Sequence, residues 1–381
     1  MTKLFYSGLA GLALFEVLKV YLIMPLPGSQ RFGSLDAAYF LHAQRWFFRI
    51  PLLLMIAAGS ASAFHASFKR WPVAAALATI AIVWVFNFQM TAESMFKQPR
   101  TLAFQHKADN KLDEGATVIG VAYNGEAKAY PIRFLVYHHQ VRDTIAGKPV
   151  MVTYCSVCRT GRVFEPIVNG HPEKFRLVGM DHFNAMFEDS STRSWWQQST
   201  GEAVAGKLKG ATLPEVECVQ VSVSKWFELH PNGLVMQTDE ASKDDCDAEG
   251  KFERGESKGK LTRTDRSSWN DKSWVVGVTI GAASKAYDWN RLKTERVIND
   301  RVGDTPIVLV LAVDEQSFAV FERPVETETF SISDDILSAG GKSYDFAGRD
   351  LTAPSQHLKR VTAYQEFWHS WRTFHPDTQK Y

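Results

Sequence analysis

Cysteine is scarce in this chain, and neither sign of charge is in excess. Four cysteines among 381 residues are too few for a disulfide-stapled scaffold, so any role of the cysteines is local. The 43 basic and 42 acidic side chains give a formal charge of +1, and no basic face is evident. We therefore expect no nucleic-acid partner, because proteins that bind nucleic acids carry a basic footprint.

Several widespread catalytic and nucleotide-binding motifs are also missing. The sequence contains no Walker loop, no zinc-protease helix, no Gly-x-Ser-x-Gly elbow and no dinucleotide fingerprint. A disordered chain is excluded as well, because 45% of the residues are hydrophobic and only 22% are charged. We expect a folded chain of two or three structural units, whose chemistry must lie outside these motifs.

Long apolar runs occur only in the first 95 residues or so. Residues 72–90 and 50–68 are each 19 positions without Asp, Glu, Lys or Arg, enough to cross about 28 Å as a helix. Residues 4–24 form a third run that contains Glu16 and Lys19. These two side chains share a helix face, so they can pair with each other or point into a bundle. The sequence predicts an α-helical membrane anchor of three spans.

The orientation of this anchor does not follow from its charges. No small-residue cleavage site follows the first run, and residues 24–28 read as a helix stop, so we expect an uncleaved anchor. The positive-inside rule, taken literally, would leave the C-terminal part in the cytoplasm. The difference in the number of Lys and Arg residues between the two sides is small, however. In addition, Arg45 falls in a predicted interfacial helix at 35–48 and Arg49 follows it directly. We therefore do not assign sidedness from this rule.

The rest of the chain repeats itself at a fixed offset. Residues 118–165 align without a gap with residues 275–322, an offset of 157. Trp226 and His230 recur as Trp371 and His375 at an offset of 145, so the second copy is shorter. Such self-similarity predicts two related domains. The predicted organisation is an anchor at 1–96, a first repeat at 97–238, a linker at 239–269 and a second repeat at 270–381.

Each repeat has the pattern of two strands, a short helix and further strands. In the first repeat, 118–122 is a β-branched run, Asn124-Gly125 is a hairpin signal, and 127–131 returns as a strand. Residues 132–141 have helical spacing, and 149–154 form the next strand. The predicted fold class is α+β, mostly antiparallel β with short helices in two tandem related domains, preceded by the α-helical membrane anchor.

Only the first repeat carries a Cys-x-x-Cys motif, formed by Cys155 and Cys158. The corresponding positions of the second repeat are Ala312 and Glu315, and unshared positions are the candidates for function. A c-type haem is disfavoured because Arg159, not histidine, follows the second cysteine. A redox dithiol needs a lowered thiol pKa, which neighbouring arginines could supply although no helix is predicted to follow.

Two other interpretations of the motif stay open. Two cysteines supply half of a zinc site, and the remaining ligands would come from elsewhere. A Cys/His/Met set would suit copper and a Cys/His set zinc, with His138 as the first further ligand. Further nearby candidates are His139, His182 and Met186. The third interpretation is a structural turn, either a cystine or a pair of buried thiols.

A polar and aromatic segment at 189–197 has no clear counterpart in the second repeat. We interpret it as a turn that leads into a strand with buried tryptophans, or as one wall of a pocket opposite the cysteines. The candidate pocket residues are Asp189, Thr192, Trp196 and Gln197. Cys218 and Cys246 could form a disulfide if this part of the chain is exported.

The order and spacing of these residues resemble a known family. The matching features are Val118-Ile119-Gly120-Val121, Ala129-Tyr130-Pro131, His138, Asp143, Pro149, Thr153 to Cys158, Asp189, Thr192, Ser194, Trp196, Gln197 and Gly201-Glu202-Ala203. The pattern is similar to that of domain-of-unknown-function family 3179. Residues 21–30 look like those of its membrane-anchored members. The chain departs from the family at Arg142, where many members have asparagine.

The resemblance implies a bacterial or archaeal protein of the inner membrane, with the soluble part in the periplasm, and it implies no activity. Our leading hypothesis is a Cys155/Cys158/His138 site that binds copper or zinc or cycles a dithiol, with a redox or membrane-protein partner. The alternative is a non-catalytic binding module with structural cysteines and an aromatic surface. That surface would comprise Trp195, Trp196, Trp226 and Trp269. A third hypothesis is a subunit of a larger membrane complex, which is favoured if Glu16 and Lys19 face partner helices.

Overall fold

The computed structural model describes residues 1–31, 33–65 and 70–381. It is an α+β structure with short helices and mostly antiparallel sheets, which confirms the predicted fold class. The chain forms two compact units that alternate along the sequence. Unit 1 comprises Met1–Lys97, Glu173–Gln197 and Glu202–Thr212, and unit 2 comprises Gln98–Pro172, Gln198–Gly201 and Leu213–Tyr381.

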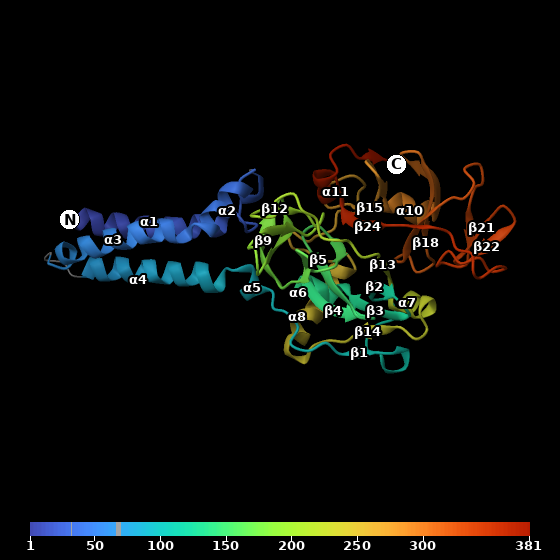
Figure 1. Cartoon of the computed structure of the whole chain (residues 1–381), viewed down its shortest axis with the longest axis horizontal. Helices are drawn as coiled ribbons and strands as arrows, with labels where there is room; N and C mark the ends of the chain where they lie inside the picture. The colour runs from blue at the N-terminus through green and yellow to red at the C-terminus, as the bar shows by residue number, and fades with distance from the viewer. Residues whose placement is uncertain (32, 66–69) are drawn as a thin grey trace. The chain divides into compact units, whose positions relative to one another are not determined.

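Unit 1 contains three helices long and apolar enough to cross a membrane, at the three predicted places. They are α1 (Thr2–Tyr21), α3 (Arg45–Phe64) and α4 (Arg70–Trp84), which η2 (Val85–Gln89) extends as a π-helix. The three helices lie side by side (Figure 1). Phe68, where the second predicted span ends, lies outside the described residues. The predicted interfacial helix is shorter than expected, because α2 ends early and Arg45 begins α3. The small helices of this unit are η1 (Ser29–Arg31), α2 (Leu35–Ala43) and α5 (Ala92–Met95).

A polar network lies inside this helix bundle. The Lys19 ammonium and the Arg49 guanidinium donate to the Glu16 carboxylate at 2.8 and 2.6 Å. Both cations also donate to the side-chain oxygen of Asn87 on η2, at 2.8 Å each. Charged groups between apolar helices are stable only when paired in this way. The predicted pairing of Glu16 with Lys19 is therefore confirmed, and Arg49 and Asn87 complete it.

A four-stranded antiparallel sheet completes unit 1, although it lies far along the sequence. Its order is β12 (Ala203–Ala205), β11 (Trp195–Gln197), β10 (Asn184–Asp189), β9 (Phe175–Asp181). The Met180 amide donates to the Ile23 carbonyl at 2.6 Å, just beyond α1. The Trp195 ring meets Tyr39 edge-on, with 5.1 Å between centroids. This sheet therefore docks directly on the N-terminal helices.

The first half of unit 2 is built from two sheets. Asn124 and Gly125 have φ values of 45° and 83°, the left-handed geometry of a tight hairpin turn, as their sequence predicts. One sheet has the order β1 (Phe104–Gln105), β14 (Leu234–Met236), β3 (Glu126–Pro131), β2 (Thr117–Tyr123), β13 (Val219–Ser222). The other has the order β4 (Gln140–Ile145), β5 (Lys148–Cys155), β6 (Thr160–Phe164).

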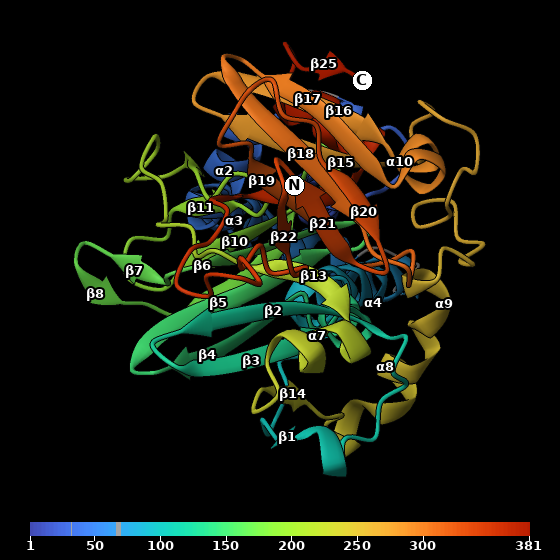
Figure 2. The same ribbon diagram turned by 90° about the vertical axis from the view of Figure 1, so that its right-hand side faces the viewer.

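The second half has a similar order of strands, except that it lacks a counterpart of β1 and adds β23 to its second sheet. Its sheets are β24 (Ala363–Phe367), β15 (Trp274–Ile280), β16 (Ala283–Asp288), β25 (Gln379–Lys380), and β17 (Val297–Val302), β18 (Thr305–Leu311), β19 (Phe318–Glu322), β23 (Arg360–Val361) (Figure 2). In both halves the last strand pairs parallel with the second strand of the hairpin, β14 with β3 and β25 with β16. The duplication and its boundaries stay a prediction about the sequence.

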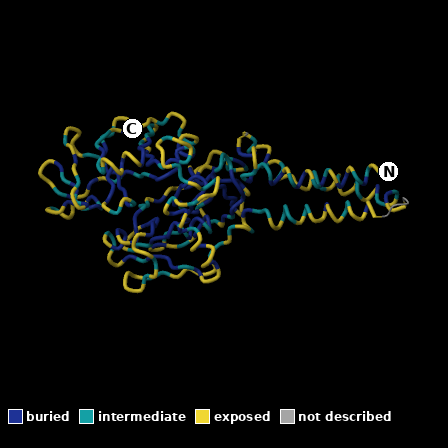
Figure 3. Tube along the Cα trace, turned by 180° about the vertical axis from the view of Figure 1, so that it is seen from behind, coloured by how far each residue is buried: buried dark blue, intermediate teal, exposed yellow. Residues whose placement is uncertain are grey.

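Short helices and small sheets fill the remaining connections of unit 2. Helix α6 (Ile132–His138) corresponds in position to α10 (Trp289–Glu295), and α7 (Val223–Leu229) to α11 (Trp368–Phe374). The others are η3 (Lys107–Asp109), β7 (Ile167–Val168), β8 (His171–Pro172), β20 (Ser331–Ser333), β21 (Ile336–Ala339) and β22 (Lys342–Tyr344). Long strands are largely buried and turns exposed (Figure 3).

The segment expected to be a linker folds onto the first half. It forms η4 (Glu240–Ser242), α8 (Lys243–Ala248) and α9 (Gly250–Glu253). Cys246 and Phe252 belong to the apolar core of the first half, together with residues of β4 and β5. The high charge density of this segment suggested a solvated linker, but a few buried side chains suffice to attach it.

Candidate functional site

The cysteine motif forms the tip of a hairpin between β5 and β6. We call residues Cys155 to Cys158 the CxxC turn. Cys155 pairs with Thr160 across the hairpin, and Arg159 closes the turn in the left-handed region with φ 58°. Both cysteines have 0% exposed surface. The two sulfur-bearing side chains therefore belong to one tight, solvent-excluded turn.

The second half of unit 2 holds this turn through three hydrogen bonds. The Lys272 ammonium donates to the Val157 carbonyl at 2.7 Å. The Nε2 atom of His369 lies 3.0 Å from the same carbonyl oxygen. The Phe367 amide donates to the Cys158 carbonyl at 2.9 Å. The turn is thus completed by residues more than a hundred positions away in the sequence.

Lys272 is the charged group that faces the cysteines. Burial lowers the pKa of Lys272 to about 8, and attraction to Cys158, Cys155 and Asp271 opposes this shift. The ammonium also lies 4.6 Å from the centroid of the Phe367 ring. Because its pKa stays above 7, Lys272 carries a positive charge at neutral pH. A half-buried cation of this kind, placed beside a thiol, favours the thiolate form of that thiol.

His369 contributes a neutral ring to the same site. Burial lowers the pKa of His369 to about 4, and the neighbouring Lys272 charge acts in the same direction. At neutral pH the ring is therefore uncharged. Its Nε2 atom lies 3.0 Å from the Val157 carbonyl and 3.2 Å from the Lys272 ammonium, so the tautomer decides whether Nε2 donates to the carbonyl or accepts from Lys272. Lys272 and His369 together fix the backbone between the two cysteines.

The two arginines that follow the motif are engaged elsewhere. The Arg159 guanidinium lies 3.5 Å from the centroid of the Trp274 ring and donates to the Glu253 carbonyl at 2.8 Å. Arg162 donates to the Glu366 carboxylate at 2.7 Å. Both arginines therefore attach the hairpin to the rest of unit 2, and the cation assigned to the sulfurs is Lys272.

The structure does not gather the predicted metal ligands. The Nε2 atom of His138, at the end of α6, lies 3.8 Å from the sulfur of Cys246. His139 follows in the left-handed region with φ 61° and is buried. Within the described ranges, no group of three or more His, Cys, Asp or Glu side chains could hold a metal ion. The Cys155/Cys158/His138 set stays a prediction.

Cys218 and Cys246 do not form the disulfide considered from the sequence. Both are free cysteines in the structure. Burial raises the pKa of each thiol to about 12, so neither is a reactive thiolate near neutral pH.

The remaining predicted residues lie in unit 1. His182 closes the β9–β10 turn, where its Nδ1 atom lies 2.9 Å from the Asp181 carboxylate. The Gln197 amide lies near the same carboxylate, at 3.4 Å. Met186 is buried on β10. These residues belong to unit 1 and the CxxC turn to unit 2, and the pocket that they were predicted to share stays a prediction.

Asp189 organises the polar segment of unit 1. Its carboxylate accepts hydrogen bonds from the Thr192 hydroxyl at 2.7 Å, the Ser194 amide at 3.1 Å and the Trp196 indole at 2.9 Å. These bonds lower the pKa of Asp189 although burial acts to raise it. The prediction of a turn that leads into a strand with buried tryptophans is confirmed, because Trp195 and Trp196 on β11 are buried.

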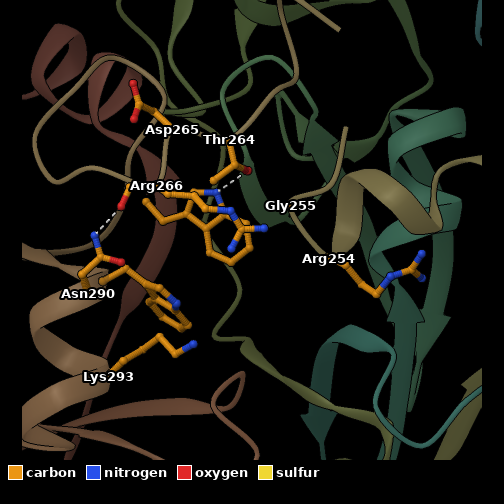
Figure 4. A pocket seen from close by; sticks show the side chains of 9 residues that line it. Arg254, Gly255, Thr264, Asp265, Arg266, Asn290 and Lys293 are labelled. Atoms are coloured by element: carbon orange, nitrogen blue, oxygen red, sulfur yellow. Dashed lines mark hydrogen bonds between the residues drawn. The ribbon is translucent and has the colours of Figure 1, made fainter. Parts of the chain in front are cut away.

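Two neighbouring cavities of unit 2 share Trp274 in their lining. The larger has a volume of about 460 Å³, and its lining includes Arg159, Glu253, Trp274 and Gln365. The smaller, of about 280 Å³, shares Trp274 with the larger (Figure 4). The labelled side chains around it are mainly polar or charged, and the Trp274 indole donates to the Thr264 hydroxyl at 3.0 Å. The larger cavity, which Arg159 lines directly after the CxxC turn, gives unit 2 a polar recess there.

Sequence reasoning missed the two side chains that complete the site. If the predicted duplication is extended by its offsets, Lys272 and His369 align with Gly115 and Ser224. A search for unshared positions in both repeats, and not only in the first, would have found them.

Comparison with protein families gives one match. A family model described as "Protein of unknown function (DUF3179)" matches residues 97–378, about three quarters of the chain. The chain belongs to this family. The match spans the CxxC turn, Lys272 and His369, so the whole site lies within the region that defines the DUF3179 family. Comparisons with curated proteins and with solved structures found no match.

Proposed function

We propose that this DUF3179 chain is a membrane-anchored thiol redox protein whose active dithiol is Cys155 and Cys158. One observation carries the proposal, the hydrogen bond of 2.7 Å from the Lys272 side chain to the Val157 carbonyl, which holds this basic group at the CxxC turn. The ammonium is half-buried, and a cysteine thiolate in the turn would stabilise its charge. Thiolates are the nucleophiles of thiol–disulfide exchange.

The reaction is exchange with a disulfide of another molecule. One thiolate attacks a sulfur of the substrate disulfide, which forms a mixed disulfide and releases one substrate thiolate. The second cysteine, as thiolate, then displaces the other substrate thiolate and closes the Cys155–Cys158 disulfide. The protein dithiol is oxidised and the substrate disulfide is reduced. Because both cysteines are fully buried, the turn must open to react, and small disulfides are favoured over folded proteins.

A transition-metal site is the second candidate, supported by the pairing of two cysteines in one tight turn. Structural zinc sites have four ligands, whereas the described residues contain no group of three. Copper in its reduced state prefers soft thiolate ligands, so copper is the stronger metal hypothesis. We rank both below the dithiol, because Lys272 donates to the turn itself.

We also propose that the soluble part faces the periplasm, where a redox or membrane-protein partner would meet it. The family resemblance supports this sidedness. The charge count that opposes it includes Arg49, which is bound to Glu16 and Asn87 inside the helix bundle. The positive-inside rule concerns charges in loops, so an arginine that is paired inside the bundle is weak evidence for the orientation of the anchor.

The proposal is tested by the pH dependence of alkylation in the full chain, reduced and kept in detergent. Iodoacetamide modification of Cys155 and Cys158 is followed by peptide mass spectrometry. In the Lys272→Met variant we expect the midpoint of the rate profile to rise by about one to three pH units, the usual effect of losing a nearby opposite charge. Lys272→Arg, which keeps the charge, should leave the midpoint near its original value.

Two controls belong to this experiment. Lys285→Met removes a lysine of the second half that pairs with Asp300, and should not move the midpoint. Metal analysis of the same preparations distinguishes the transition-metal site from the dithiol. Stoichiometric copper or zinc that disappears in a Cys155→Ser/Cys158→Ser variant would replace the dithiol by a metal site. An unchanged midpoint in Lys272→Met would refute the role given to Lys272.

A further inference from the structure

Unit 1 contains a cavity of about 400 Å³ whose lining is rich in basic side chains. Lys19 and Asn87 come from α1 and η2, and Arg45 begins α3. Arg176 comes from β9 and Arg193 from the turn before β11. Lys19 is buried, whereas Arg45 and Arg193 are exposed. The cavity therefore has a buried cation at its base and exposed cations at its edge.

The acidic side chains nearby do not neutralise this lining. Glu16 pairs with Lys19 inside the bundle, and Glu188 pairs with Arg176 and Arg193 at 2.8 and 3.2 Å. Arg45 makes no ion pair in the part of the chain that the structure describes. Around the cavity the basic side chains outnumber the acidic ones by five to three. The basic ones are Lys19, Arg45, Arg49, Arg176 and Arg193, and the acidic ones are Glu16, Glu93 and Glu188.

His42, which also lines the cavity, responds to this excess of positive charge. Burial lowers the pKa of His42 to about 3, and the charges of Lys19, Arg176 and Arg45 lower it further. Its Nε2 atom lies 3.2 Å from the Lys19 carbonyl. His42 is therefore neutral at physiological pH, and the cavity keeps its positive charge on lysine and arginine.

The cavity lies at one end of the three apolar helices. The end of α1, the beginning of α3 and the π-helix η2 all contribute to its lining. Large aromatic side chains near the same end are exposed: Trp46, Phe47, Trp84 and Phe88. Aromatic belts of this kind mark the level of the lipid headgroups. The basic cavity is thus placed where phosphate groups of a bilayer would lie.

We infer that this cavity binds the phosphate of an anionic lipid headgroup. Basic pockets between membrane helices suit such headgroups, and arginine forms paired hydrogen bonds with phosphate oxygens. Apolar lining residues, including Phe86 and Phe88 from η2 and Leu177 from β9, offer surface for the glycerol and the upper acyl chain. The inference concerns unit 1 and is independent of the dithiol proposal.

Native mass spectrometry of the detergent-solubilised full chain tests this inference. Phosphatidylglycerol and phosphatidylcholine are added separately at equal concentration. We expect phosphatidylglycerol adducts to survive at collision energies that remove phosphatidylcholine. Arg45→Gln should weaken phosphatidylglycerol binding about fivefold, the effect of one basic side chain near an anionic headgroup. Arg70→Gln, at the start of α4 and thus at the other end of the bundle, should leave binding unchanged.

Three outcomes would overturn the inference. Equal retention of the two lipids would remove the preference for an anionic headgroup. Displacement of phosphatidylglycerol by an excess of inorganic phosphate would identify a free phosphate as the ligand. Equal binding by Arg45→Gln and Arg70→Gln would place the lipid elsewhere. If Arg45→Gln fails to fold, Arg193→Gln replaces it, because Arg193 is exposed and Glu188 keeps Arg176 as a partner.

Discussion

Around the β5–β6 hairpin, the structure buries several basic side chains, and each is stabilised differently. Arg162 pairs with Glu366, which is also buried, and lies 3.2 Å from the centroid of the Tyr364 ring. Arg159 instead uses backbone carbonyls and the Trp274 ring. Removing one partner of a buried ion pair costs about 3–5 kcal/mol, because the other charge stays buried. Lys272 is only half-buried, and a thiolate at Cys155 or Cys158 would add to the stabilisation that the Val157 carbonyl and the Phe367 ring give it.

His139 is a buried histidine that stays neutral in the folded chain well below physiological pH. Burial lowers the pKa of His139 to about 4. The unfolded chain binds a proton near pH 6.5, so it holds more protons than the folded chain between about pH 6.5 and 4. The stability from His139 is therefore complete above pH 6.5 and decreases as the pH falls. We expect the free energy of unfolding to decrease by about 1.4 kcal/mol for each pH unit below 6.5 in this window.

Urea unfolding of the full chain in detergent at pH 7, 6 and 5 measures this effect. His139→Gln cannot take up the proton, so its stability should depend less on pH than that of the wild type. His171→Gln, on an exposed strand, should keep the wild-type dependence. Equal slopes for all three proteins would show that His139 does not couple folding to pH.

At the scale of elements, each half of unit 2 uses a glycine to bring a helix against its hairpin. A Cβ atom at Gly120 on β2 would lie 2.2 Å from the ring of Trp226 on α7. A Cβ atom at Gly277 on β15 would lie 2.1 Å from the ring of Trp371 on α11. Both tryptophans are fully buried, so neither ring can move away. The two contacts occupy matching places in the halves.

Substitution of these glycines should therefore destabilise the fold. We expect Gly120→Ala and Gly277→Ala each to lower the free energy of unfolding by about 1–3 kcal/mol, the usual effect of overpacking. Gly115→Ala is the matched control, because the nearest atom to its Cβ would lie 3.8 Å away. Thermal unfolding of the full chain measures all three. Midpoints for Gly120→Ala and Gly277→Ala equal to that of Gly115→Ala would argue against the close contact.

Local elements of this fold could be predicted, whereas the partners of the site could not. The Asn124-Gly125 turn and the strands beside it follow from local preferences, which a short window of sequence contains. The CxxC turn was found because its spacing is a local pattern. Lys272 and His369 reach it only through packing between two halves of unit 2, and no local pattern specifies such a contact.

At the scale of the molecule, unit 1 is assembled from segments far apart in the chain. Composition suggested that the N-terminal helices end at about residue 96 and that the soluble part begins there. The sheet of residues 173–212 instead belongs to the same compact unit as the helices. Its contacts with them involve backbone atoms of Ile23 and Met180 and the ring of Trp195, which composition does not reveal.

This arrangement predicts that a fragment starting at Lys97 is incompletely folded. Without the helices, the Met180 amide loses its acceptor, and Trp195, which is fully buried in the full chain, loses its contacts with Tyr39 and His42. Exposure of such a tryptophan removes about 1.5–3 kcal/mol or more of burial free energy. Residues 173–212 should then open locally, while unit 2 keeps its own apolar cores.

Limited trypsin digestion with mass spectrometry distinguishes local opening from an intact fragment. In the fragment 97–381 we expect faster cleavage at Lys174, Arg176 and Arg193 than in the full chain, with residues 213–381 protected in both. Co-expression with residues 1–97 should restore protection, because it returns the missing surface of unit 1. Equal cleavage of fragment and full chain would mean that the sheet is stable alone. The dithiol measurements are therefore designed for the full chain, in which both units are complete.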